Sequence, residues 1–239
     1  MPRKTPTLSK LSRPRLHNAV VRERLFAKLD EAQSHPTICV VGPPGAGKTT
    51  LVASWLDARG IKGIWYQIDA GDADAASFFH YLGLAAGPLV PSRLRLPTFA
   101  PEYRNDVAGF ARRYFRTLFE SLPADSVVVL DNLQDAGLAT TLYQVLTVAA
   151  VELPNGFNLV AISREKPPEA FARLSANRLL FTIDWDDLRL TLQETERIAG
   201  ALLPSRTVKA QELHEQCQGW VAGLTLMLER AKHTDEVEA

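Results

Sequence analysis

One stretch, from Gly42 to Thr50, constrains the fold of this chain more than any other. It reads Gly-Pro-Pro-Gly-Ala-Gly-Lys-Thr-Thr, and it lies between the apolar run 37–41 and the helix-forming run 51–56. A buried strand, a glycine-rich turn ending in Gly-Lys-Thr and a helix, in this order, are typical of a phosphate-binding P-loop. Glycine lets backbone N–H groups curl around a polyphosphate, and the following helix directs the positive end of its dipole at the same anion.

The loop residues have expected roles toward a nucleoside triphosphate. Lys48 is expected to reach the β- and γ-phosphates, the Thr49 hydroxyl to ligate Mg²⁺, and Thr50 to hydrogen-bond the α-phosphate. The predicted cofactors are therefore ATP or ADP together with Mg²⁺. The loop residues predicted to bind nucleotide are Gly42, Pro43, Pro44, Gly45, Ala46, Gly47, Lys48, Thr49 and Thr50.

Two further apolar runs end in polar residues that suit the same site. The run 126–131 reads as a strand covered on both faces, and it ends in Asp131. Its distance from the P-loop fits a Walker B strand, whose aspartate holds the Mg²⁺ shell, often through water. The run 157–164 ends in Arg164, which reaches the carboxyl edge of the sheet and is placed to sense a γ-phosphate. The alternative for Arg164 is a solvent-facing arginine in a turn.

Strands and helices alternate along most of the chain, which predicts an α/β fold with a five-stranded parallel sheet and helices on both faces. From Trp185 onward the pattern is helical only, and Thr191 and Glu194 have the spacing of a capping box. The expected strands are 37–41, 64–69, 126–131, 157–164 and 179–184, and the expected helices are 22–33, 51–56, 75–86, 107–122, 138–152, 191–202, 208–218 and 219–232. We expect an extended amino-terminal arm over 1–20, a P-loop nucleotide-binding domain over 21–184 and a helical domain over 185–239.

Composition limits the cellular compartments and the binding partners that we expect for this protein. The 27 basic and 27 acidic side chains leave a net charge of zero, so nothing global attracts nucleic acid or acidic membranes. No apolar run approaches the length of a membrane span, and two cysteines make no disulfide framework. We therefore expect a cytoplasmic protein without membrane contact. On the helix 107–122, Arg112, Arg113 and Arg116 lie close together, where a solvated face is favoured over a nucleic-acid patch.

Four stretches together resemble the nucleotide-binding core of the MalT-like STAND ATPases. These are bacterial signal-transduction regulators that often end in a LuxR-type DNA-binding domain. The similarity spans residues 8–232, and it favours the basic arm as part of the fold over a targeting peptide. The stretches are 10–16 with 21–25, 42–50, 127–131 with Arg164, and 213–224, which reads Leu-His-Glu-Gln-Cys-Gln-Gly-Trp-Val-Ala-Gly-Leu.

The resemblance implies a P-loop NTPase sheet of the ASCE type, with Arg164 at the sensor-one position. It also implies that Val21 and Arg22 touch adenine and that the helical segment around 219–224 closes over the nucleotide. Members of the family act as switches: ADP holds a closed, inactive monomer, and ATP with an inducer opens it and permits self-association. The chain is then the ATP/ADP-binding module of a regulator of assembly and transcription, with no specific DNA binding of its own.

The residue after Asp131 departs from the family, which usually has a second acid where this chain has Asn132. An amide cannot take a proton from water, so we expect slow ATP hydrolysis, with Asp135 or Asp69 as the replacement base. The candidate catalytic residues are Lys48, Asp131, Arg164 and Asp135.

Three other functions stay open at this point. A turnover ATPase of the AAA+ type would need fast hydrolysis, against which Asn132 argues. A small-molecule kinase would need a substrate pocket and a catalytic acid, which the proline-rich loop 87–105, long enough for an insertion or a lid, and Asp69 leave open. A non-enzymatic scaffold would use nucleotide as structural glue. Because no DNA-binding module follows residue 239, the chain reads as a natural short form or a fragment.

Overall fold

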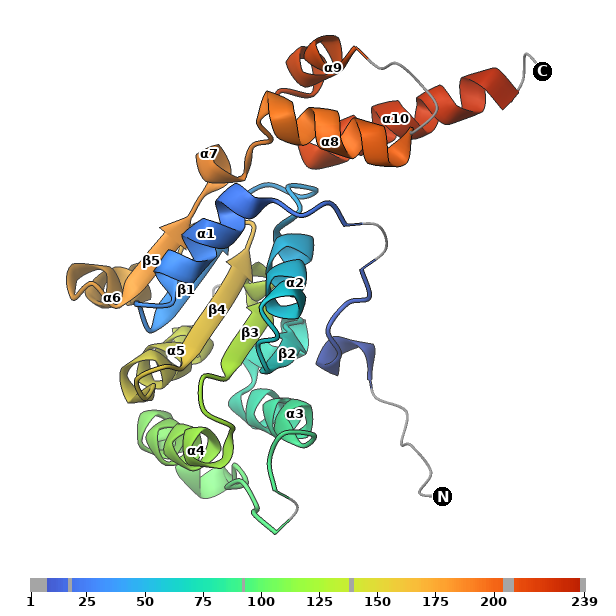
Figure 1. The fold of residues 1–239 in the computed structure, drawn as a ribbon. Helices are drawn as coiled ribbons and strands as arrows, with labels where there is room; N and C mark the ends of the chain where they lie inside the picture. Colours follow the sequence, from blue (N-terminus) through green and yellow to red (C-terminus); the bar gives the residue numbers. More distant parts are fainter. Residues whose placement is uncertain (1–7, 17–18, 92, 138–139, 204–208, 237–239) are drawn as a thin grey trace, which may run out of the picture.

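A five-stranded parallel sheet forms the centre of the computed structural model, which describes residues 8–16, 19–91, 93–137, 140–203 and 209–236 (Figure 1). The strand order is β2-β3-β4-β1-β5, and all four pairings are parallel. The α/β fold and the five strands predicted from the sequence are confirmed, with small shifts at the strand ends. The strands are β1 (Thr37–Val41), β2 (Gly63–Gln67), β3 (Val127–Asp131), β4 (Asn158–Ser163) and β5 (Leu180–Ile183).

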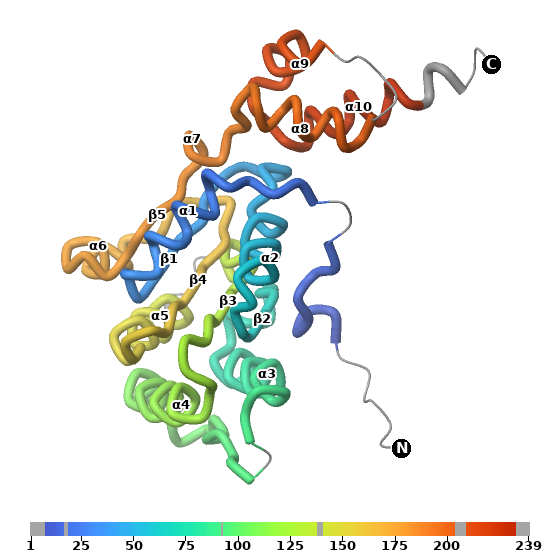
Figure 2. The backbone as a smooth tube through the Cα atoms, viewed as in Figure 1, coloured from blue at the N-terminus to red at the C-terminus, as the bar shows by residue number. Residues whose placement is uncertain are grey.

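Helices cover both faces of this sheet, as the tube in Figure 2 also shows. Helices α1 (Glu23–Ala32) and α2 (Lys48–Ala58) pack on one face, and α3 (Ala75–Ala86), α4 (Val107–Ser121) and α5 (Thr140–Glu152) pack on the other. Successive side chains of a strand point to opposite faces, so β3 sends Val127 and Val129 to one apolar cluster and Val128 and Leu130 to the other. This explains why the runs are continuously apolar instead of alternating.

The strand order also defines the subtype of the sheet. Strand β4 lies between β1, which leads into the P-loop, and β3, which ends in Asp131. A strand inserted between these two is the feature that distinguishes the ASCE type. The carboxyl ends of β1, β4 and β3 therefore meet at one edge of the sheet, and that edge carries the candidate site.

After β5 the chain is helical, with α7 (Trp185–Leu188), α8 (Leu192–Leu202), α9 (Ala210–Cys217) and α10 (Val221–Glu236). The predicted capping box at the start of α8 is confirmed, because the Glu194 N–H donates to the Thr191 hydroxyl at 3.2 Å and the Thr191 N–H donates to the Glu194 carboxylate at 3.0 Å. We call α8–α10 the helical segment; it lies beyond the carboxyl ends of the strands (Figure 1). None of the helices in the described ranges has the length and apolarity needed to cross a membrane.

Residues 1–7 and 17–18 of the predicted amino-terminal arm lie outside the described residues. The described part forms the short 3₁₀ helix η1 (Ser9–Leu11), which is fixed to the sheet by Lys10. The Lys10 ammonium pairs with Asp69 at 2.6 Å and with Asp72 at 3.3 Å, and it lies 4.5 Å from the centre of the Tyr81 ring. The basic residue is thus part of the fold, in agreement with the family resemblance.

The loop 87–105 is not a lid over the P-loop. It packs against α3 and α4, on the part of the molecule away from the start of α2 (Figure 1), and it ends in the 3₁₀ helix η3 (Pro101–Asn105). The Phe99 ring stacks on Phe79 at 5.8 Å and meets Phe110 edge to face at 5.0 Å. Aromatic packing fixes this loop, which the prolines in its sequence did not reveal.

The arginines of α4 have structural partners. Arg112 and Arg116 both pair with Glu152 at the end of α5, at 3.1 and 2.6 Å. The Arg113 guanidinium lies 4.8 Å from the centre of the Tyr103 ring. These contacts join neighbouring elements, and they support the solvated face that the sequence favoured.

Candidate functional site

The P-loop leads from β1 directly into α2, which begins at Lys48. Gly47 precedes it with φ at 80°, a left-handed conformation that favours glycine, and no side chain caps the helix within the described residues. The first N–H groups of a helix have no acceptor inside the helix, so they are left to bind whatever lies in front of it. An uncapped helix that starts from a glycine-rich loop is well suited to bind phosphate.

Lys48 is buried beside this helix start, with 8% of its surface exposed. Its ammonium donates to the carbonyl oxygens of Gly42 at 2.6 Å and Pro43 at 2.9 Å. The pKa of Lys48 lies below its ordinary value because of burial and then of the positive charge of Arg164, against the attraction of Asp131. Two cations and the helix start therefore surround one small region at the edge of the sheet.

Thr49 and Asp131, the two residues predicted to hold Mg²⁺, are brought together. The Thr49 hydroxyl lies 3.1 Å from each carboxylate oxygen of Asp131. Burial raises the pKa of Asp131, although hydrogen bonds from Thr49 and from the Asn132 N–H oppose that rise. A hydroxyl and a carboxylate side by side supply the hard oxygen donors that Mg²⁺ prefers, so these residues fit the ion.

The residues after Asp131 form a polar turn that reaches Arg164. Asn132 has φ at 59°, a left-handed conformation that asparagine tolerates, and the 3₁₀ helix η4 (Leu133–Ala136) follows it. The Gln134 side chain accepts the Arg164 N–H at 2.9 Å and donates to Asp135 at 2.9 Å. Gln134 therefore links the ends of β3 and β4. We did not predict this residue, although its place in the turn after Asp131 is a usable signal.

Asp135 and Asp69, the two predicted replacement bases, follow two paired strands of the sheet, β3 and β2. The negative charge of Asp135 contributes to the raised pKa of Asp131, so the two carboxylates are near each other. Asp69 follows β2, and strands β3 and β4 lie between β2 and β1 in the sheet. Its carboxylate pairs with Lys10 and accepts the Gly71 N–H at 2.9 Å. Asp69 therefore has a structural partner in Lys10, and its role as a base stays a prediction.

The helical segment contacts the P-loop directly. The Trp220 indole N–H donates to the Pro44 carbonyl oxygen at 2.9 Å, and the Ala222 N–H donates to the Gly45 carbonyl oxygen at 3.0 Å. A Cβ atom on Gly45 would lie 2.5 Å from the Cβ atom of Ala222, so only glycine permits this approach. Similarly, a Cβ atom on Gly223 would lie 2.8 Å from the Trp220 ring. Close packing around Trp220 and Ala222 therefore requires glycine at both positions.

A buried ion pair fixes the other side of the helical segment. Arg22 is 7% exposed, and its guanidinium donates to the Glu194 carboxylate and to the Leu188 carbonyl oxygen, both at 2.9 Å. Burial by itself would raise the pKa of Glu194, but the hydrogen bonds and charges of Arg22, Thr191 and Arg24 outweigh burial and lower it. Arg22 therefore holds the junction between α1 and α8.

A small, mostly apolar pocket of about 200 Å³ lies between the P-loop side of α2 and the helical segment. We call it the Val20 pocket. Val21, predicted to touch adenine, does not line it, since its side chain is 39% exposed and the neighbouring Val20 takes that place. Val221 lies within the segment 219–224 that the resemblance implied, whereas Ile198, Leu202 and Thr225 gave no sign of this role in the sequence. The pocket is lined by Ala19, Val20, Arg22, Gly47, Thr50, Leu51, Ser54, Ile198, Leu202, Val221 and Thr225.

Sheet order, P-loop and paired Thr49 and Asp131 together define a P-loop NTPase fold. A solved structure of a Walker-type ATPase from Pyrococcus abyssi agrees with this class: it matches with a TM-score of 0.53 and 17% identity, over 90% of this chain and 71% of that chain. No family model matches the chain.

The chain is also similar to the HTH-type transcriptional regulators MalT of three bacteria, which confirms the resemblance seen in its motifs. Identity is 29% over 234 residues with the protein of Vibrio cholerae (94% of this chain, 25% of the relative) and 29% over 232 residues with that of Serratia proteamaculans (95% and 25%). It is 30% over 230 residues with that of Cronobacter sakazakii (92% and 24%). The chain spans about a quarter of the length of these relatives.

Proposed function

We propose that this chain is the ATP/ADP-binding switch module of a transcriptional regulator, in which the helical segment closes on the P-loop. One observation carries the proposal: Trp220 and Ala222 donate hydrogen bonds to the carbonyl oxygens of Pro44 and Gly45. A nucleotide and the helical segment would bind the same loop, and any change that one makes in the affinity of the other is reciprocal. The similarity to MalT regulators supports the regulatory role.

In this proposal the nucleotide lies across the start of α2. The first-turn N–H groups and Lys48 hold the phosphates, Thr50 contacts the α-phosphate, and the base enters the Val20 pocket. Lys48 must exchange its bonds to the carbonyl oxygens of Gly42 and Pro43 for bonds to phosphate oxygens. Charge-assisted bonds to phosphate are the stronger ones, so the exchange favours binding.

Thr49 and Asp131 would hold Mg²⁺, and the ion when bound neutralises phosphate charge. The remaining chemistry belongs to the residues of this chain. In this proposal Arg164 approaches the terminal phosphate, and Asp135, whose charge acts on Asp131, accepts a proton from water. Asn132 cannot accept that proton, which supports slow hydrolysis suited to a switch.

The kinase alternative loses the two features that kept it open. Asp69 is engaged with Lys10, and the loop 87–105 packs on α3 and α4. A turnover ATPase remains disfavoured by Asn132. The contact between the helical segment and the P-loop has no necessary part in either alternative, whereas a switch requires it.

Calorimetric titration with ATP or ADP and Mg²⁺ tests the proposal. We expect micromolar binding by the wild-type chain and a loss of at least about 100-fold in Lys48→Ala, because the main phosphate counter-charge is removed. Lys62→Ala, which changes an exposed lysine just before β2, is the matched control and should bind like the wild type. Equal affinity of Lys48→Ala and the wild type would rule out the P-loop assignment.

A further inference from the structure

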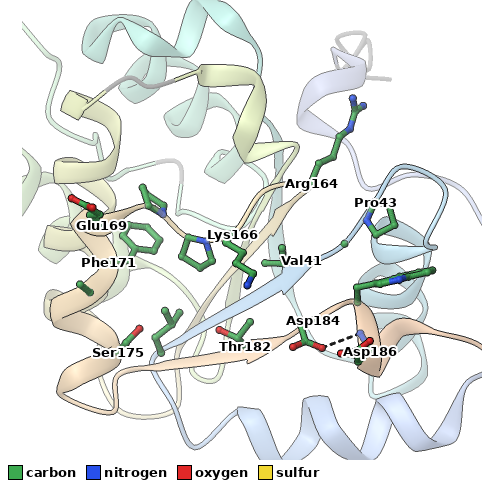
Figure 3. A pocket seen from close by; sticks show the side chains of 16 residues that line it. Val41, Pro43, Arg164, Lys166, Glu169, Phe171, Ser175, Thr182, Asp184 and Asp186 are labelled. Atoms are coloured by element: carbon green, nitrogen blue, oxygen red, sulfur yellow. Dashed lines mark hydrogen bonds between the residues drawn. The ribbon is translucent and has the colours of Figure 1, made fainter.

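A second and larger pocket opens on the β5 side of the P-loop, and its volume is about 910 Å³ (Figure 3). Pockets that bind small molecules usually measure about 300–1,000 Å³. We call it the β5 pocket. Its floor is the sheet face formed by Val41, Leu180 and Thr182, and its walls are the segment 164–175 and the turn 184–186. Among the described residues, it has no lining residue in common with the Val20 pocket.

The pocket exists because one face of β5 is not covered. The helix that follows β4 on this face, α6 (Ala172–Ala176), is too short to extend over the edge strand. Leu180 is consequently half-buried and Thr182 exposed, although both belong to a parallel strand. Parallel sheets are normally covered on both faces, so we expect a ligand or another element to cover the open face of β5 beside the P-loop.

The described residues of the lining supply an apolar surface and two cations, Lys166 and Arg164. Pro167, Phe171, Leu180 and Trp185 supply apolar surface. In Figure 3 the Lys166 side chain extends into the pocket toward Thr182 and Asp184, whereas Arg164 points away. The Lys166 ammonium forms no ion pair within the described part of the chain, so its charge is available to a ligand.

The acids of the lining limit the charge of that ligand. Asp184 accepts the N–H group of Asp186 at 3.0 Å, so part of its carboxylate is already satisfied. Asp186 lies 3.9 Å from Arg189, and Glu169 stands at the rim. Three carboxylates near the Lys166 ammonium repel a polyphosphate, so we expect no second nucleotide here. A single negative charge beside Lys166 is compatible with this lining.

We propose that the β5 pocket binds a small organic monoanion with an apolar body and that this ligand communicates with the P-loop. Gly42 and Pro43, which line the pocket, are the residues whose carbonyl oxygens hold Lys48. Gly42 is also packed against α7, since a Cβ atom there would lie 2.9 Å from Leu188. A ligand in this pocket would therefore contact the P-loop itself. The pocket does not depend on the proposed nucleotide site, but the communication between ligand and nucleotide rests on it.

Titration with two probes tests the pocket itself. The fluorescent monoanion 8-anilinonaphthalene-1-sulfonate is titrated into the chain, and 4-phenylbutyrate, a carboxylate with an aromatic body, is used to displace it. We expect saturable binding that weakens about tenfold in Lys166→Ala and is retained in Lys166→Arg, since a charge-assisted bond is lost in one and kept in the other. Thr182→Trp fills the pocket from an exposed position and should abolish displaceable binding.

Lys62→Ala is the control for removal of an exposed lysine elsewhere, and circular dichroism checks that each variant is folded. Lys166 and Thr182 are both exposed, so folding should be retained. Absence of saturable binding, or binding that neither Lys166→Ala nor Thr182→Trp weakens, would overturn the proposal.

A titration of 4-phenylbutyrate with and without saturating ADP tests the communication with the P-loop. We expect its affinity to change about fivefold or more, which is the usual scale of coupling between two sites. An unchanged affinity in the presence of bound ADP would overturn the communication. If ADP itself does not bind, the proposed function fails, and the probe titration still decides whether the β5 pocket is a site.

Discussion

The α/β unit and the helical segment are held together by different forces. In the α/β unit, two extensive apolar clusters fill both faces of the sheet. The helical segment has one small cluster, built around Leu190, Ile198, Leu224 and Leu228. The helical segment meets the P-loop through hydrogen bonds from Trp220 and Ala222, and it meets α1 through the pair of Arg22 with Glu194.

This difference indicates which part would move in the proposed switch. Burial of apolar surface contributes about 25 cal/mol of stability for each Å² removed from water. Opening the α/β unit would therefore cost a large free energy. A hydrogen bond contributes only about 0.5–1.5 kcal/mol net, because water replaces the partner when the bond breaks. In the proposed switch, the helical segment would therefore leave the P-loop at a cost that a nucleotide can supply, while the sheet beneath it stays intact.

The largest effect is expected from Glu194→Ala, which breaks the junction. Arg22 would stay buried without its carboxylate, and removal of one partner of a buried pair costs about 3–5 kcal/mol. Urea unfolding should show this loss, and hydrogen exchange should place it in α8–α10 and not in the strands. Glu212→Ala, which removes the exposed partner of Lys209, should leave the unfolding curve unchanged. Equal loss of protection in sheet and helices would contradict the two-part picture.

Asn132→Asp changes the chemistry of the α/β unit and leaves the helical segment as it is. Aspartate tolerates the left-handed conformation at this position, and the new carboxylate can accept a proton from water. We expect basal ATP turnover below about 1 s⁻¹ in the wild type and a rise of at least about tenfold in the variant. Steady-state phosphate release measures both rates.

The matched variant for this experiment is Asp135→Ala. If Asp135 is the base that serves the wild type, its removal lowers the slow rate further. Fast wild-type turnover that survives Asp135→Ala would leave the proposed mechanism without a base.

A smaller effect is expected from Trp220→Phe, which keeps the ring but removes its N–H donor to Pro44. Loss of about 1 kcal/mol from the closed state corresponds to about a fivefold change in its population. Nucleotide dissociation, followed by stopped flow, should accelerate by about that factor. Lys62→Ala, at an exposed position just before β2, is the control. Identical dissociation from both variants would show that the Trp220 contact has no part in closure.

The smallest effect is expected from a mild change in pH. The pKa of Glu194 is lowered from its ordinary value of 4.5, so its pair with Arg22 stabilises the fold fully above that pH. This stabilisation is lost as the pH falls below 4.5 through the lowered pKa, and the contribution of Glu194 should not change between pH 7 and 5. Unfolding curves of the wild type and Glu194→Gln should converge only in acid. A difference between them that does not depend on pH would contradict this linkage.

Local patterns in the sequence determined most of the fold and the centre of the site. Continuous apolar runs located five strands, and Gly42–Thr50 identified the P-loop before any contact was known. The capping box of Thr191 and Glu194 was also readable, because each of these signals depends on neighbours only a few residues apart. Asp131 could be assigned for the same reason, since it ends an apolar run.

Tertiary structure alone decided what depends on distant residues. The order of the strands separated Asp69 from the P-loop, and aromatic packing on α3 fixed the loop 87–105. The contact of Trp220 with Pro44 joins residues 176 positions apart, and the β5 pocket results from a helix too short to cover an edge strand. Such contacts form only when the whole chain is packed, because no local propensity specifies which surfaces meet or which remain open.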